Sequence, residues 1–402
     1  MKKRVFYFLL ILIISLFACE SIDTKKAGFR IAIVTGGPRY SLEAINGAKE
    51  LIKKYGAVKD GGIIEHITYS DNFVKEKDNI VKKIVALSKD PLVKAIIVNE
   101  AVAGTAEAFN KIRSRRPDIL LLAADPQEPL GIIQEASDLV VSEDFISRGF
   151  TIPWVAKKMG AENLVYISFD RHLRLENVRV REEIMKKTCN DLGMNFYYKE
   201  APDPLGFVGL AGLKDFINKK VPVWLGAYGE KTAFFCTSDA GAEPIISSLL
   251  KEHEGIFVES ALPSPVTGYQ RALLLDLSKT KSQKHLIQKV RLSIENNVAL
   301  KRLGTWYYSH SASLSIALGE YAKQVIDGTT KKGNLAALEN IMREYMPETK
   351  IRTSVYIDEK TKKRAENHML IYSDTYVFGQ GFIYTTEQAI PPKYQYVKIE
   401  KN

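Results

Sequence analysis

From residue 29 to about residue 145 the chain alternates short apolar runs, rich in β-branched residues, with longer amphipathic stretches. Such runs are typical of strands buried on both faces of a parallel sheet. In the first amphipathic stretch, apolar residues recur at helical spacing between Ser41, which suits an N-cap, and Gly56, which ends the helix. The predicted strands are Arg30–Thr35, Ile63–Tyr69, Ala95–Asn99, Ile119–Ala124 and Leu139–Ser142. Together these units predict a doubly wound α/β sheet.

A second series of the same kind follows a predicted helix over Phe145–Gly160 and indicates a second lobe. Its predicted strands are Asn163–Phe169, Asn195–Tyr198, Thr232–Thr237 and Gly255–Glu259. Its predicted helices lie near 175–192, 207–219 and 242–253.

Beyond residue 260 the alternation stops and the topology becomes harder to predict. A helix is expected over Ser309–Asp327, and paired strands are expected near 351–357 and 368–373. We predict that residues 29–145 and about 262–328 form lobe I. We predict that residues 146–261 and about 329–395 form lobe II with a C-terminal extension of strands.

The first residues of the chain have the pattern of an export signal. Three basic residues, Lys2, Lys3 and Arg4, precede the apolar run Val5–Ile14, which is shorter than the ~20 apolar residues that a membrane-spanning helix needs. Leu16-Phe17-Ala18 then precedes Cys19, which resembles the lipobox of bacterial lipoproteins. The resemblance implies a signal peptide over 1–18, lipid on Cys19 and a tether over 19–28. An ordinary secretory signal, with Cys19 incidental, is the alternative.

Charge and cysteine content exclude several classes of function. Removal of Lys2, Lys3 and Arg4 lowers the formal net charge from +10 to +7, and the remaining basic residues are dispersed, which argues against a nucleic-acid partner. The other cysteines, Cys189 and Cys236, fall in separate predicted elements and suit buried positions. Because the chain lacks the usual phosphate-binding, zinc-binding and nucleophile motifs, we predict no cofactor, no metal and no enzymatic activity.

Several stretches resemble a type I periplasmic binding protein, in which two α/β lobes joined by a hinge close on a ligand. They are Phe29–Gly37, Asn46–Glu50, Thr232–Ala242 and the predicted helix from Ser309 to Val325. More narrowly, five stretches are similar to an uncharacterised bacterial lipoprotein family of this fold, a likeness that runs from about 29 to 275. They are Ile33–Gly36, Thr68–Phe73, Ile167–His172, Ala201–Pro204 and Phe234–Pro244. The likeness implies the architecture and leaves the ligand open.

Ligands of open parallel sheets bind beyond the carboxyl ends of the strands, so polar residues just after each strand are the candidates. In lobe I they are Thr35, Gly37, Arg39, Tyr40, Asn99, Glu100 and Asp125. In lobe II they are Asp170, Arg171, His172, Asp203, Ser238, Asp239 and Glu259. The resemblance favours Asp239, since the matching aspartate of sugar-binding relatives accepts hydrogen bonds from ligand hydroxyls. Each residue could instead cap a helix or complete a turn.

These observations favour a membrane-anchored, extracytoplasmic receptor that captures a small polar solute for an ABC-type permease or a sensor. Two alternatives remain open: a structural or adhesive lipoprotein with a vestigial cleft, and a hydrolase that uses carboxylates such as Asp170 and Asp239. The mixed charges of the candidate residues suit a neutral polyol and a zwitterion equally.

Overall fold

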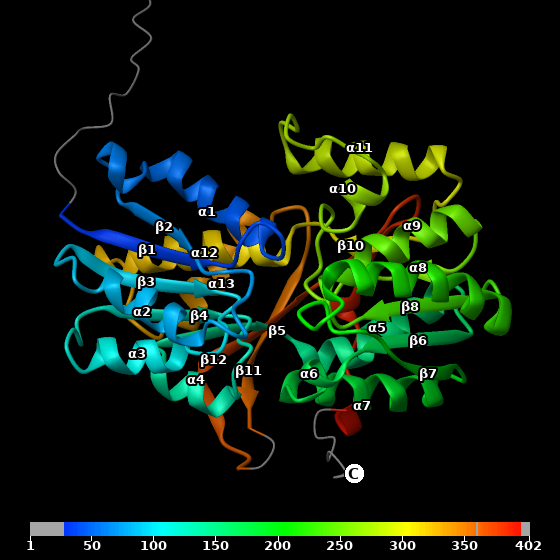
Figure 1. Cartoon of the computed structure of the whole chain (residues 1–402), viewed down its shortest axis with the longest axis horizontal. Helices are drawn as coiled ribbons and strands as arrows, with labels where there is room; N and C mark the ends of the chain where they lie inside the picture. Colours follow the sequence, from blue (N-terminus) through cyan, green and yellow to red (C-terminus); the bar gives the residue numbers. More distant parts are fainter. Residues whose placement is uncertain (1–27, 359–360, 395–402) are drawn as a thin grey trace, which may run out of the picture.

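The computed structural model describes residues 28–358 and 361–394. The predicted signal peptide, Cys19 and all but the last residue of the predicted tether lie outside the described residues. Two α/β lobes lie side by side, with β1 to β4 in one and β6 to β9 in the other (Figure 1). Within the described ranges, no helix has both the length and the hydropathy needed to span a bilayer.

Lobe I contains a seven-stranded sheet in the order β11-β12-β5-β4-β3-β1-β2. The first series supplies β1 (Arg30–Thr35), β2 (Ile64–Thr68), β3 (Val93–Asn99), β4 (Leu120–Ala124) and β5 (Leu139–Glu143). All neighbours within this series pair in parallel, as the alternating sequence predicts.

Alternate strand residues of lobe I enter separate cores because side chains of a strand point to opposite faces. Ile31 and Ile33 belong to the core beneath one set of helices, whereas Ala32 and Val34 belong to the core on the other face. The first set is α1 (Leu42–Tyr55), α12 (His310–Ile326) and α13 (Leu335–Tyr345). The second set is α2 (Lys77–Leu87), α3 (Thr105–Arg113) and α4 (Leu130–Ala136).

Lobe II contains a parallel sheet in the order β7-β6-β8-β9. Its strands are β6 (Asn163–Ser168), β7 (Asn195–Glu200), β8 (Thr232–Cys236) and β9 (Ile256–Phe257). Helices α8 (Gly209–Tyr228) and α9 (Ala242–Glu252) cover one face, and α5 (Phe145–Lys158) and α7 (Glu176–Asp191) cover the other. A short helix, α6 (Asp170–Leu173), follows β6. Cys189 and Cys236 are both buried and free, as predicted.

The C-terminal part of the chain differs from the predicted domain division. Strands β11 (Ile351–Ile357) and β12 (Arg364–Ser373) pair with each other as predicted, but β12 also pairs in parallel with β5 and extends the sheet of lobe I. The buried run Met369–Ile371 places this strand where it covers the otherwise open apolar edge of β5. The prediction that residues 329–395 all belong to lobe II is therefore wrong for these two strands and for α13, which packs on lobe I.

The segment after β9 is also divided differently. Helix α10 (Tyr269–Ala272) packs against α9, and α11 (Gln283–Asn296) lies above lobe II in Figure 1, although both had been assigned to lobe I. A small sheet of β10 (Gly304–Trp306), β13 (Thr375–Val377) and β14 (Gly381–Ile383) belongs to lobe II, because Val377 and Ile383 enter the core beneath α5 and α7. The chain thus passes between the lobes near Asp144, over residues 307–309 and near Asp374.

Candidate functional site

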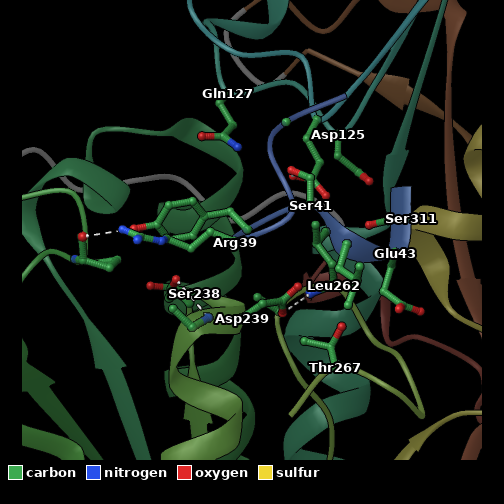
Figure 2. Close-up of a pocket in the computed structure, with 18 of the residues that line it drawn as sticks. Arg39, Ser41, Glu43, Asp125, Gln127, Ser238, Asp239, Leu262, Thr267 and Ser311 are labelled. Atoms are coloured by element: carbon green, nitrogen blue, oxygen red, sulfur yellow. Dashed lines mark hydrogen bonds between the residues drawn. The ribbon is translucent and has the colours of Figure 1, made fainter. Parts of the chain in front are cut away.

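A cleft lies between the two lobes and is lined by residues that follow the strands of both sheets. It encloses about 1700 Å³ of space free of protein atoms, including the part open to solvent. Figure 2 shows Ser41 and Asp125 of lobe I on one side and Ser238 and Asp239 of lobe II on the facing side. The carboxyl ends of the strands in both lobes therefore face the same space, as the strand-end rule expects.

Glu100 is the most unusual carboxyl group in the cleft. It follows β3 with a positive φ of 56°, and only 7% of the residue is exposed. The Ser41 hydroxyl donates a 2.5 Å hydrogen bond to its Oε2 atom. Burial, with a smaller contribution from the carboxylates of Asp239 and Asp125, raises the pKa of Glu100 to about 8 against the opposing effect of the Ser41 hydrogen bond. The protein therefore holds a carboxyl group in surroundings that favour its neutral form.

Asp125 follows β4, also with a positive φ, of 43°. Its Oδ1 atom accepts a hydrogen bond from the Glu143 amide at 3.1 Å and lies 3.0 Å from Nε2 of His310. Only 7% of its side chain is exposed, and its Oδ2 atom is buried without a hydrogen-bond partner among the described residues. A buried carboxylate oxygen without a partner is costly, so this atom has unused capacity to accept a hydrogen bond.

Asp239 follows β8 and brings a third carboxyl group to the cleft from lobe II. Its Oδ1 atom accepts a 2.9 Å hydrogen bond from the Leu262 amide, drawn as a dashed line in Figure 2. Burial raises the pKa of Asp239 to about 6, although the Leu262 amide and the Arg148 guanidinium oppose the rise. The adjacent Ser238 caps the turn after the strand by accepting from the Ala240 amide at 3.4 Å.

The basic residues of lobe II that line the cleft already have partners. Arg171 donates two hydrogen bonds to Asp203, of 2.7 and 3.0 Å, in a bidentate pair. The Nδ1 atom of His172 lies 3.1 Å from the Thr237 hydroxyl. Burial, together with the charge of Arg171, lowers the pKa of His172 to about 3. His172 is therefore a neutral hydrogen-bonding group at physiological pH.

A buried ionic network joins the lobes beside the cleft. Arg148 of α5 donates to Glu143 at the end of β5, at 2.5 Å, and to Glu259 beyond β9, at 2.8 Å. It also donates to the Ser260 and Ala261 carbonyls. Arg181 of α7 makes a second contact with Glu143. Although burial opposes it, the two glutamates raise the pKa of Arg148, so the network holds two negative and two positive side chains.

The structure places many of the predicted site residues on the cleft wall. Those that line it are Gly37, Arg39, Tyr40, Glu100, Asp125, Arg171, His172, Ser238 and Asp239. Arg39 is exposed at its edge, and Tyr40 reaches across to lobe II, where its hydroxyl donates to the Pro204 carbonyl at 3.4 Å.

Other predicted residues lie elsewhere. Thr35 is fully buried, with its hydroxyl bonded to the Gly36 carbonyl and 3.0 Å from His66. Asn99 is also fully buried, and its amide donates to the Ser311 carbonyl and the Ser315 hydroxyl, which holds α12 against the sheet.

In lobe II, three predicted site residues are likewise absent from the cleft wall. Asp170 is exposed at the start of α6, outside the cleft, which contradicts the pairing of Asp170 with Asp239 in a hydrolase. Asp203 positions Arg171, and Glu259 belongs to the buried ionic network. The candidate roles of Asp170, Asp203 and Glu259 as ligand-facing groups are therefore corrected.

Several residues on the cleft wall were not predicted. Ser41 was expected only to cap α1, yet its side chain makes no capping bond and contacts Glu100 instead. Asp71 and Gln127 also line the cleft and lie just past β2 and β4, so a strand-end search extended by three residues would have found them. Ser311 comes from α12, which returns to lobe I after a crossing, and no strand-end signal marks it.

No group of three or more histidine, cysteine, aspartate or glutamate side chains in the described part of the chain is arranged to hold a metal ion. The carboxyl groups of the cleft are therefore too dispersed to converge on a single ion. What the arrangement offers is a set of hydrogen-bond acceptors distributed over both lobes, suited to a ligand with several donor groups.

Comparison with known proteins gives relatives without an assigned function. A family model described as "Protein of unknown function (DUF3798)" matches residues 29–304, and a second model, which has no description, matches residues 315–397. Two uncharacterised proteins of Treponema pallidum (strain Nichols) are each 46% identical to the chain. One match spans 168 residues, 42% of this chain and 78% of the relative, and the other spans 180 residues, 44% and 81%.

Solved structures share the fold at low sequence identity. A protein of Clostridium difficile 630 described as a transcriptional regulator is 20% identical with a TM-score of 0.70, over 87% of this chain and 99% of that one. An ABC transporter solute-binding protein of Clostridium phytofermentans with bound L-rhamnose is 10% identical with a TM-score of 0.50, over 88% and 96%. The predicted α/β fold of two lobes is confirmed.

Proposed function

We propose that this chain, which belongs to the DUF3798 family of proteins of unknown function, is a receptor that captures a small polar solute between its lobes. The observation that carries the proposal is the convergence of Glu100, Asp125 and Asp239, from the strand ends of opposite lobes, on one cleft. The alternative of a structural or adhesive protein with a vestigial cleft would favour apolar side chains at these positions. The solute-binding activity named for the structural neighbour of Clostridium phytofermentans agrees with the receptor.

The contacts between the lobes suit a receptor that opens and closes. Tyr40 of lobe I donates to the Pro204 carbonyl of lobe II across the cleft, and Arg148 of lobe II donates to Glu143 of lobe I. A ligand that contacts strand ends of both lobes gains more contacts in the closed state than in the open state. It therefore shifts the population toward closure.

We propose further that the receptor is exported and anchored by lipid on Cys19, and that it passes its solute to an ABC-type permease or reports it to a sensor. The support is the charged start, the short apolar run and the lipobox-like Leu16–Cys19 of the sequence. The predicted tether over residues 19–28 would hold the start of β1 within a few nanometres of the membrane, at ~3.5 Å per residue.

Binding is tested by thermal shift and isothermal titration calorimetry with a panel of sugars, amino acids, nucleosides and amines. We expect saturable binding of at least one compound to the wild type and to Asp170→Asn, a control outside the cleft, and weaker binding to Asp239→Asn. Catalytic turnover of the bound compound, or equal binding by Asp239→Asn, would contradict a receptor that uses this cleft.

Anchoring is tested separately with the full chain expressed in a diderm bacterium. We expect the wild type in the membrane fraction, with a diacylglyceryl-modified N-terminal peptide by mass spectrometry, and Cys19→Ser in the soluble exported fraction. Equal fractionation of the two proteins would refute the anchor and leave the cleft proposal intact.

A further inference from the structure

The charged side chains along the cleft are unevenly provided with partners. Arg171 is held by Asp203, Lys214 contacts Glu243 at 2.7 Å, and Arg181 is held by Glu143. These basic groups are therefore largely neutralised by residues of lobe II or by the network between the lobes. Arg39, which lines the cleft from lobe I and is exposed at its edge, is the exception among the basic residues named here, so the positive charge available to a ligand lies at the edge of the cleft.

The carboxyl groups at the centre show the opposite pattern. Glu100 and Asp239 make no ion pair with any of the residues that the structure describes, and each accepts only from hydroxyl or amide groups. Asp125 has His310 beside its Oδ1 atom, but its Oδ2 atom lacks a partner within the described ranges. These three carboxyl groups are close enough for Asp239 and Asp125 to disfavour ionisation of Glu100.

Carboxyl groups that have no basic partner in the protein indicate that the ligand carries positive charge. A neutral polyol would bind the carboxylates through its hydroxyls but would leave their mutual repulsion in place. A metal ion is disfavoured because, in the described part of the chain, no three candidate ligands are arranged around one point. A protonated amine or guanidinium supplies both several N–H donors and a positive charge, and it can be extended to reach separated carboxylates.

Resting on the receptor function proposed above, we propose that the cleft ligand is an extended organic cation, whose protonated amino or guanidino groups bind Glu100 and Asp125 of lobe I and Asp239 of lobe II. The buried Oδ2 atom of Asp125 then gains the donor that it lacks in the structure.

The same arrangement makes closure of the cleft depend on the charge of the ligand. Glu100 and Asp239 belong to opposite lobes, so closure without a ligand brings two carboxyl groups together with no cation between them. A cation between them stabilises the ionised form of both carboxyl groups and is attracted to both. A neutral ligand of the same shape lacks this effect, so it should close the cleft less effectively.

The test uses matched pairs of commercial compounds that differ in charge, with binding measured by calorimetry at pH 7.5. The pairs are putrescine and 1,4-butanediol, butylguanidine and butylurea, and D-glucosamine and D-glucose, with spermidine as an extended cation. We expect the cationic member of at least one pair to bind ten-fold or more tightly than its neutral partner. We expect Glu100→Gln and Asp239→Asn each to reduce that affinity at least ten-fold, and Asp170→Asn to leave it unchanged.

The outcomes separate this inference from the receptor itself. Tighter binding of a neutral sugar, lost in Asp239→Asn, would preserve the receptor and overturn the cationic ligand. Cation binding that Glu100→Gln and Asp239→Asn do not weaken would also overturn it, because the cation would then bind elsewhere. Absence of binding by every compound in this and the earlier panel would overturn both proposals. Circular dichroism and thermal unfolding of each variant establish that any loss of affinity occurs in a folded protein.

Discussion

Replacement of Glu100 by glutamine should make the ligand-free protein more stable at pH 8 while leaving it almost unchanged at pH 4.5. The native pKa of Glu100 is raised from its ordinary value of 4.5 to about 8, chiefly by burial. An acid with a raised native pKa loses stability as pH rises, because the unfolded chain ionises first. The loss therefore develops between about pH 4.5 and pH 8 and is complete above the native pKa.

The size of the effect follows from the pKa difference. At about 1.36 kcal/mol for each pKa unit, the penalty at pH 8 is at most roughly 5 kcal/mol. Opening of the cleft would return water to the carboxylate and reduce this value, so we expect a gain of about 2–4 kcal/mol for Glu100→Gln at pH 8. The glutamine carbonyl can still accept the hydrogen bond from Ser41, so the contact that positions the side chain is kept.

The assay is urea unfolding of the chain without residues 1–18 at pH 4.5, 6 and 8, followed by circular dichroism. The matched control is Glu135→Gln, a substitution of the same type at an exposed position of α4. Glu100→Gln should flatten the decline of stability between pH 4.5 and 8 relative to the wild type and to the control. The reasoning would be refuted if Glu100→Gln kept the pH dependence of the wild type, or if the substitution destabilised the protein equally at all three pH values.

Three further substitutions test the packing around the cleft. Arg148→Met leaves Glu259 buried without its arginine and removes one of the two arginines that contact Glu143, so it should lower the free energy of unfolding by about 3–5 kcal/mol in urea; a loss under 1 kcal/mol would contradict the network's role. Gly47→Ala would place a Cβ atom in steric clash with the Ala312 carbonyl oxygen where α1 meets α12, so we expect a loss of about 1–3 kcal/mol in the same assay, and unchanged stability would show that the helices can separate. Tyr40→Phe removes the hydrogen bond across the cleft and should shift the open population by roughly five-fold, measured by single-molecule FRET between the lobes; an unchanged distribution would show that the bond does not hold the closed state.

The sequence supports prediction where structure depends on neighbours along the chain. Buried parallel strands such as β1 and β3 are short apolar runs followed by helices, so their limits and direction could be inferred. The sheet to which β12 belongs depends on the open edge of β5, more than 200 residues earlier, and no local pattern records that pairing. For the same reason the prediction placed several segments after residue 260 in the wrong lobe.

The site shows the same division between local and non-local information. The rule that polar strand ends face the cleft located Glu100, Asp125 and Asp239. It placed Asn99 there too, one residue before Glu100, although its side chain turns the opposite way and holds α12. Alternate residues of a strand point to opposite faces, and the exact end of the strand decides which one reaches the ligand. Because that end is uncertain by one or two residues in a sequence, this distinction could not be made.

Two sets of acidic residues stand at the junction of the lobes and differ in what surrounds them. Glu143 and Glu259 are buried, yet Arg148 and Arg181 supply matching charge, so that this contact can persist whether or not a ligand is present. Glu100 and Asp239 are also buried carboxyl groups that line the cleft, but neither makes an ion pair with an arginine among the described residues, and burial raises the pKa of both. A buried carboxylate is stable only when its charge is balanced or when it takes up a proton. The first pair is balanced from within the chain. In the second pair, burial favours the neutral form of Glu100, and the organic cation proposed above would supply the positive charge that the chain does not.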